Sequence, residues 1–172
     1  MKKILIALSF IIQFQPALAE KFTLGSDVIN LPIEKSWLAK QSDNKGSLVF
    51  FNPKEKNPRP ITSLYFAKVL YPTQDVSTFK DEFIKEKIKW IEEVGAKSNK
   101  AVKADEIDQH REILIEAEFN FQNNDFIEIT RMRECSKTKT IILKMLFPKN
   151  LLKTEQKQFD ELKEVNFCPE VL

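Results

Sequence analysis

The sequence is poor in glycine and histidine, and each shortage removes a class of function. Three glycines occur among 172 residues, so the chain offers neither a glycine-rich phosphate loop nor a flexible glycine linker. His110 is the only histidine, and nothing in the sequence pairs it with Cys135 or Cys168. No G-x-S-x-G motif surrounds a serine. Because no nucleophile, base and orienting group can be assembled from motifs, we predict that the protein is not an enzyme.

Long apolar runs and excess charge are missing as well. After residue 14 no apolar stretch approaches membrane-spanning length. The chain carries 27 basic and 25 acidic side chains, and two of the lysines belong to the leader described next. The remainder is therefore close to neutral and lacks the electrostatic footprint of a nucleic-acid-binding protein.

What the sequence does have is an export leader. Lys2 and Lys3 precede a mostly apolar run, and Ala17-Leu18-Ala19 supplies a small-residue cleavage site. We predict a signal peptide over residues 1–19 and a single domain over 20–172, located in the periplasm or secreted. A buried N-terminal helix is the alternative. Glu20 stands where a lipoprotein would need cysteine, so we expect no lipid anchor.

Hydrophobic periodicity then predicts an α+β fold. Short β-type segments lead up to residue 70, and Phe79, Phe83, Ile88 and Ile91 lie on one face of a predicted helix. Alternating segments at 112–121, 126–135 and 140–147 predict a three-strand meander with one buried and one mostly wet face. A second amphipathic helix follows over about 151–166. We predict an antiparallel sheet with both helices packed on it.

The segments FTLGSDVINLPIEKSWLAKQ and GSLVFFNP, followed by this order of strands and helices, resemble the PsbP-like fold. The resemblance covers nearly all of residues 20–172. It implies an accessory or partner-binding role and no catalysis. It carries no functional residue onto this chain.

One acidic stretch is a candidate metal site. Glu106, Asp108 and His110 would share a face of an extended chain. Their side chains would lie about 6–7 Å apart, which is too wide for a single ion without a bulge. We therefore favour a solvated junction between loop and strand, and expect neither a metal nor another cofactor.

Three residues are candidates for contact with a partner or ligand. Arg131 and Arg133 share a strand face, where guanidinium groups could bind an anion or a partner. We favour instead that they pair with glutamates of the neighbouring strand. Trp90 falls beside the apolar stripe of its helix, so it either contacts a partner or closes the edge of the core.

The two cysteines are expected to form a disulfide. Cys135 ends the middle strand of the meander, the next strand runs away over roughly 26 Å, and the last helix returns over roughly 24 Å. Cys168 therefore comes back to Cys135, and exported domains commonly oxidise such a pair.

These observations lead to a functional hypothesis. We predict an exported protein that acts by binding an unknown protein partner, in an accessory, inhibitor or immunity-type role. The alternatives are a carrier of a small apolar or anionic ligand between sheet and helix, and a hydrolytic enzyme without a recognisable motif.

Overall fold

The computed structural model describes residues 20–42, 46–51, 60–67, 79–98, 103–107 and 111–169. The predicted leader, residues 1–19, lies outside these stretches. In chain order the elements are β1 (Glu20–Leu24), β2 (Asp27–Leu31), β3 (Leu38–Gln41), β4 (Ser47–Phe51), β5 (Pro60–Ala67), α1 (Lys80–Glu93), β6 (Lys97–Ser98), β7 (Lys103–Ile107), β8 (Glu112–Phe121), β9 (Asn124–Ser136), β10 (Lys139–Pro148) and α2 (Lys149–Glu164).

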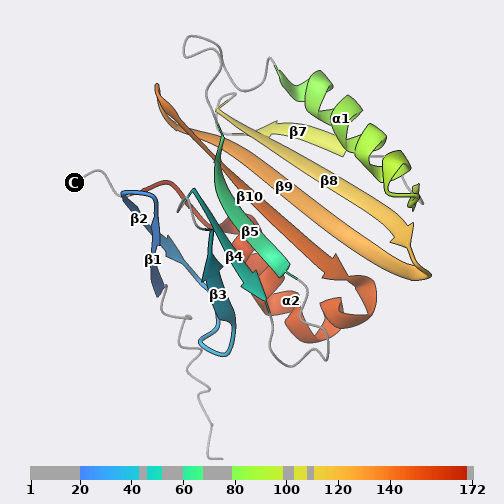
Figure 1. Ribbon diagram of the computed structural model, residues 1–172, viewed down its shortest axis with the longest axis horizontal. Helices are drawn as coiled ribbons and strands as arrows, with labels where there is room; N and C mark the ends of the chain where they lie inside the picture. Colours follow the sequence, from blue (N-terminus) through green and yellow to red (C-terminus); the bar gives the residue numbers. More distant parts are fainter. Residues whose placement is uncertain are drawn as a thin grey trace, which may run out of the picture.

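The protein has the α+β fold that the sequence predicts (Figure 1). An eight-stranded antiparallel sheet has the order β3-β4-β5-β10-β9-β8-β6, and β7 pairs with β8 beside β6. A separate β1–β2 hairpin makes a second small sheet. No helix within the described stretches is both long and apolar enough to cross a membrane.

The main core lies on the face of the sheet covered by α2 and the β1–β2 hairpin. Alternation along the long strands points every second side chain to this face. Phe159 of α2 meets Phe147 of β10 edge to face, with ring centroids 5.0 Å apart. Fully buried side chains of this core include Leu24, Ile29, Leu31, Phe50, Leu64, Ile141, Leu143, Met145, Phe147, Leu162 and Phe167.

Polar contacts also tie α2 in place. The buried amide of Gln158 donates to the Pro32 carbonyl, and its oxygen accepts from the Glu34 backbone N–H at 2.8 Å. Both bonds join α2 to the segment that follows β2. A buried amide is tolerated here because its partners are supplied.

The opposite face carries α1 and two smaller clusters. Ile91 is the one buried side chain among the residues of α1. It packs with Ala117, Phe119 and Phe126, while Phe83 packs against a group around Met132. Helices therefore cover both faces of the sheet (Figure 1).

This arrangement corrects the expected wet face of the meander. Glu112 is buried, and Glu116 and Glu118 meet Lys163 and Lys149 of α2 at 2.6 and 2.8 Å. The acidic face is thus the one beneath α2, where arginines of β9 pair with Glu112 and lysines of the helix pair with the other two glutamates. The predicted meander is present, whereas β6 and β7 were not foreseen.

Candidate functional site

The side chains of the sheet facing α1 form rows across the strands. The register pairs Ile113 of β8 with Met132 of β9, Met132 with Ile142 of β10, and Ile142 with Tyr65 of β5. The next row on this face contains Ile115, Thr130 and Lys144, and the one after it contains Ala117, Glu128 and Leu146. An apolar row is therefore followed by rows that carry a hydroxyl, an ammonium and a carboxylate.

α1 aims three side chains at these rows. Phe83, Lys87 and Trp90 recur at steps of four and three residues, so they lie on one helical face. Phe83 joins the apolar row, and Trp90 meets Phe119 edge to face with centroids 5.6 Å apart. We call the space between α1 and the strands β5, β10, β9 and β8 the α1 groove.

A buried carboxylate organises the charges of this groove. Glu128 is only 1% exposed; its Oε1 accepts from the Lys87 ammonium and from the Thr130 hydroxyl, the latter at 3.2 Å. The Lys144 ammonium lies 3.4 Å from Oε2, which has no hydrogen-bond partner within the described structure. One desolvated carboxylate thus faces two ammonium groups.

Trp90 contributes to holding both cations. The Lys87 and Lys144 nitrogens lie 4.6 and 5.0 Å from its ring centroids. Both distances are within the range of cation–π attraction. The indole therefore acts as a wall of the charged part of the groove.

The environment shifts two titratable groups. Burial raises the pKa of Tyr65, and the negative charge of Glu128 raises it further. Burial lowers the pKa of Lys87, with Glu128 opposing the shift and the positive charge of Lys144 adding to it. The Tyr65 hydroxyl is therefore held in its protonated, donating form.

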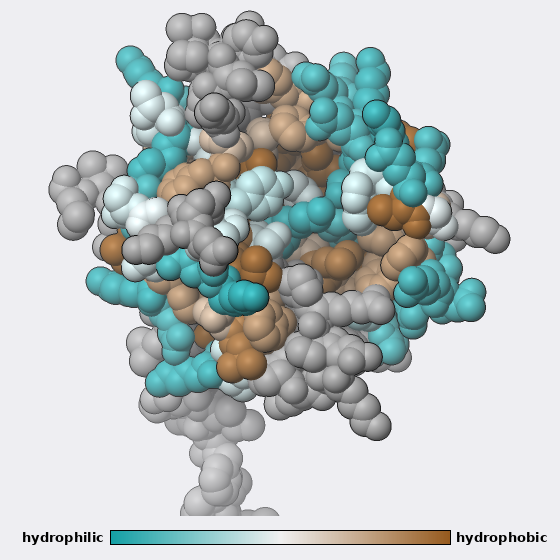
Figure 2. Space-filling view, viewed as in Figure 1, coloured by the Kyte–Doolittle hydropathy of each residue, from teal (hydrophilic) through white to brown (hydrophobic). Residues whose placement is uncertain are grey.

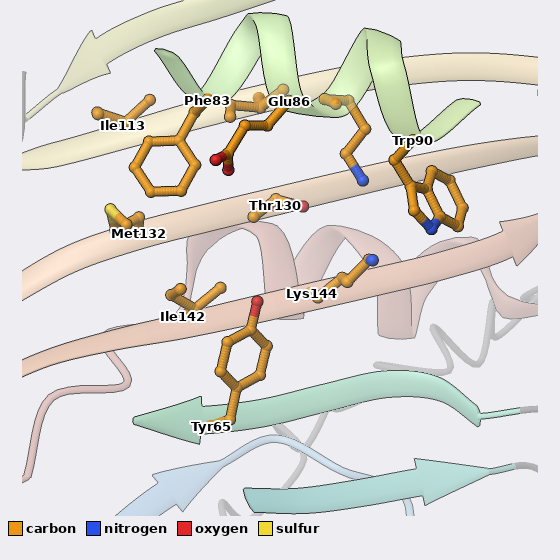
Figure 3. Close-up of a pocket in the computed structure, with 11 residues that line it drawn as sticks. Tyr65, Phe83, Glu86, Trp90, Ile113, Thr130, Met132, Ile142 and Lys144 are labelled. Atoms are coloured by element: carbon orange, nitrogen blue, oxygen red, sulfur yellow. The ribbon is translucent and has the colours of Figure 1, made fainter. Parts of the chain in front are cut away.

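Two hollows adjoin one another at Trp90. The first, of about 180 Å³, has Phe83, Met132 and Ile142 at one end and Lys144 at the other. Figure 3 shows Phe83, Ile113, Met132 and Ile142 gathered together, while the Tyr65 hydroxyl points between Ile142 and Lys144 and the Lys144 nitrogen extends towards Trp90. The second hollow, of about 170 Å³, is lined by Trp90, Val94, Phe119, Phe121, Phe126 and Leu146. Figure 2 shows this face hollowed beside α1, with hydrophobic and hydrophilic residues adjoining in the hollow.

The chemistry of the groove suits binding. Glu128 is the natural candidate for a general base, but its Oε1 already accepts from Lys87 and Thr130, and the Lys144 ammonium lies against its Oε2. Lys87 is the amine with the lowered pKa, yet its nitrogen is engaged by the same carboxylate. Apolar walls with a few convergent polar groups are the usual composition of a ligand site.

The predicted arginine patch is not an open surface. Arg131 is buried and pairs with Glu112, and Arg133 reaches the other oxygen of Glu112 at 3.0 Å. Arg131 also donates to the Val165 carbonyl at 2.7 Å beneath the end of α2. The favoured pairing with a glutamate of the neighbouring strand is therefore present.

The predicted disulfide is present. Cys135 and Cys168 are joined with their Cα atoms 5.3 Å apart. The bond links the end of β9 to the segment after α2, as the element lengths required.

The candidate metal site lies mostly outside the part of the chain that the structure describes. Asp108 and His110 lie outside the described residues, and Glu106 is described only through its place in β7. Within the described stretches no group of three ligand-type side chains could hold a metal ion.

Sequence reasoning singled out Trp90 but missed Tyr65, Lys87, Glu128 and Lys144. A signal was available in β9 and β10. Glu128 shares its strand face with Phe126 and Met132, and Lys144 shares its face with Ile142. A charged residue at the apolar phase of an alternating strand is a candidate for a buried or functional site.

Comparison with known proteins identifies the fold. No protein-family profile and no curated protein matches the chain. Cyanobacterial PsbP (CyanoP) of Synechocystis is similar in structure, with a TM-score of 0.59 at 12% identity over 88% of this chain and 92% of that one. A Pseudomonas aeruginosa protein of unknown function aligns over 90% of this chain and 99% of its own, at 13% identity and a TM-score of 0.49. The chain thus has the PsbP-like fold that its sequence resemblance implied.

Proposed function

We propose that this chain is an exported protein that acts by binding a protein partner, in an accessory, inhibitor or immunity-type role. In this proposal residues 1–19 are removed as a signal peptide, and residues 20–172 work as one domain in the periplasm or outside the cell. The disulfide between Cys135 and Cys168 supports it, because such bonds persist in oxidising compartments.

The observation that carries the proposal is the position of Trp90. This side chain is partly exposed, it lines both hollows of the α1 groove, and two ammonium groups lie against its ring. An aromatic side chain set in a concave apolar surface is typical of residues that dominate binding energy. The PsbP-like fold adds an expectation of partner binding by resemblance.

A capture experiment with matched variants tests this proposal. The chain purified from a periplasmic fraction is immobilised and exposed to extract of the same compartment. We expect one stoichiometric protein to be retained, and to be lost with Trp90→Ala. Lys89→Ala is the control, because Lys89 lies on the same helix with its side chain 74% exposed. Equal retention by Trp90→Ala and the parent chain would overturn the groove as the partner site.

A second candidate is carriage of a small ligand, which the dimensions of the first hollow favour. Its volume of about 180 Å³ is comparable with that of an engineered cavity of about 150 Å³ that binds benzene. Native mass spectrometry of the purified protein distinguishes the two functions. A co-purifying mass of small-molecule size supports carriage, and its absence beside a captured protein supports the partner function.

A further inference from the structure

The buried and half-buried ionic groups of the α1 groove do not balance. Glu128 contributes one negative charge at 1% side-chain exposure, whereas Lys87 and Lys144 contribute two positive charges at 11% and 31%. Glu86 also lines the hollow, and Figure 3 shows its carboxylate pointing into it, but it is an exposed residue of α1. Water and salt screen an exposed carboxylate more strongly than a buried one. Among the side chains that water screens least, the cations therefore outnumber the anion.

Lys144 is the cation best placed to use this excess. The Lys87 ammonium bonds directly to Glu128 Oε1, together with the Thr130 hydroxyl. The Lys144 ammonium stands 3.4 Å from Oε2, which is longer than the roughly 2.7–2.9 Å of a charge-assisted hydrogen bond. Its nitrogen can therefore donate to a second anion without giving up a short bond.

Tyr65 supplies a second donor for such an anion. It lies on β5, which neighbours the strand β10 of Lys144, and its hydroxyl lies beside the Lys144 side chain, whose nitrogen extends towards Trp90 (Figure 3). A phenol that stays protonated donates one hydrogen bond. An ammonium and a hydroxyl on neighbouring strands suit the two oxygens of a carboxylate.

The apolar end of the same hollow limits the size of the group that a bound anion can carry. Phe83, Ile113, Met132 and Ile142 enclose it from α1 and three strands of the sheet. The whole hollow measures about 180 Å³, which is enough for a ring-sized group together with a carboxylate and too little for a long chain.

We propose that the α1 groove receives a carboxylate joined to a ring-sized apolar group, with the carboxylate at Lys144 and Tyr65 and the apolar group against Phe83 and Met132. This inference rests on the proposed function, because it names the chemistry of what the groove binds. The carboxylate can come from a free aromatic acid or from a peptide that ends in phenylalanine.

Calorimetry with paired probes tests the chemistry. The chain, with its disulfide formed, is titrated with 3-phenylpropanoate and with 3-phenylpropanamide, and then with a short peptide ending in Phe as the free acid and as the amide. We expect each acid to bind at least tenfold more tightly than its amide. Binding of both acids identifies the shared chemistry. Binding of the peptide acid alone identifies a chain terminus as the source, and binding of the free acid alone identifies a small molecule.

Two variants give opposite expectations. Lys144→Gln should weaken the binding of the acid about tenfold or more, since it removes the ammonium. Glu86→Gln should strengthen it severalfold, since it removes a like charge from the rim of the groove. Glu86 is exposed, so this variant keeps the test informative if Lys144→Gln fails to fold. Lys89→Gln, outside the groove on the same helix, should change nothing.

The contradicting outcomes separate this inference from the proposed function. Equal binding of acid and amide, or weaker binding by Glu86→Gln, would overturn the anionic ligand. If neither acid binds while a partner is captured through Trp90, the inference fails and the partner function stands. If both acids bind while Trp90→Ala retains the partner as well as the parent chain does, the inference stands and the groove is not the partner site.

Discussion

The two helices cover opposite faces of one sheet, and different interactions hold them there. α2 brings Phe159 and Leu162 into the main core, and the disulfide joins the segment beyond its end to β9. Within α1 only Ile91 is buried, and Lys87 and Trp90 line a hollow that also contains charged side chains. One face of the sheet thus holds the main core, whereas the other has open volume beside charged side chains.

Buried ion pairs occur on both faces, but they serve different ends. On the α2 face Glu112 holds Arg131 and Arg133, and Arg131 also reaches carbonyls at the end of α2 and the ring of Phe167. On the α1 face Glu128 holds Lys87 closely and Lys144 loosely, beside open volume. The first cluster is the more enclosed, with Glu112 and Arg131 at 1% and 5% side-chain exposure. In the second cluster Lys144 is 31% exposed and lines a hollow.

The largest expected effect on stability comes from the enclosed cluster. Glu112→Gln leaves the Arg131 side chain, 5% exposed, without its anion in a desolvated site. Removing one member of a buried pair costs about 3–5 kcal/mol of unfolding free energy. Urea unfolding followed by circular dichroism measures the loss.

Glu116→Gln is the matched control on the same strand. Glu116 pairs with Lys163 at side-chain exposures of 39% and 33%, and exposed pairs contribute roughly 0–1 kcal/mol. Similar losses for the two variants would contradict the contrast between an enclosed and an open pair.

The next effect concerns the disulfide. Converting both Cys135 and Cys168 to alanine should lower the unfolding free energy by about 3–4 kcal/mol for a loop of this length in the chain-entropy model. Amide hydrogen exchange should show faster opening at the end of α2 and little change in α1. Reductant should give the same loss in the parent chain and none in the double variant. Two free thiols in protein taken from the periplasm would refute the bond.

Much of the fold could be predicted because local patterns and lengths specify it. Alternation in the meander placed its strands, and the matched lengths of β10 and α2 brought Cys168 back to Cys135. Which face of each strand is covered was harder to predict. Glu112 and Glu116 lie at the polar positions of an alternating strand, which predicts a solvent-exposed face. That face becomes an interface only because α2, which is distant in sequence, packs on it.

The candidate site was predicted only through Trp90. Its other members come from β5, β9, β10 and α1, and cross-strand register decides which of them meet. Register depends on pairing between distant segments, so spacing along the chain cannot supply it. Short strands such as β6 (Lys97–Ser98) carry too few residues for a periodic signal.

The smallest expected effect is a change in the pKa of Tyr65 within the groove. It separates the contribution of the Glu128 charge from that of burial. In a Tyr71→Phe background, absorbance of the phenolate reports on Tyr65, and we expect it to appear above the ordinary tyrosine pKa of 10.0. Glu128→Gln removes the smaller cause, so the pKa of Tyr65 should fall but stay raised by burial. Far-UV circular dichroism verifies that the variant is folded.

The raised pKa of Tyr65 also makes the unfolding free energy depend on pH. Because the folded state keeps the Tyr65 proton where the unfolded state has lost it, unfolding free energy decreases as pH rises from about 10 towards the raised pKa of Tyr65. Glu128→Gln should narrow this window, since the pKa of Tyr65 in the folded state moves down towards its unfolded value. An unchanged Tyr65 titration in Glu128→Gln would contradict the contribution of the Glu128 charge to the raised pKa of Tyr65.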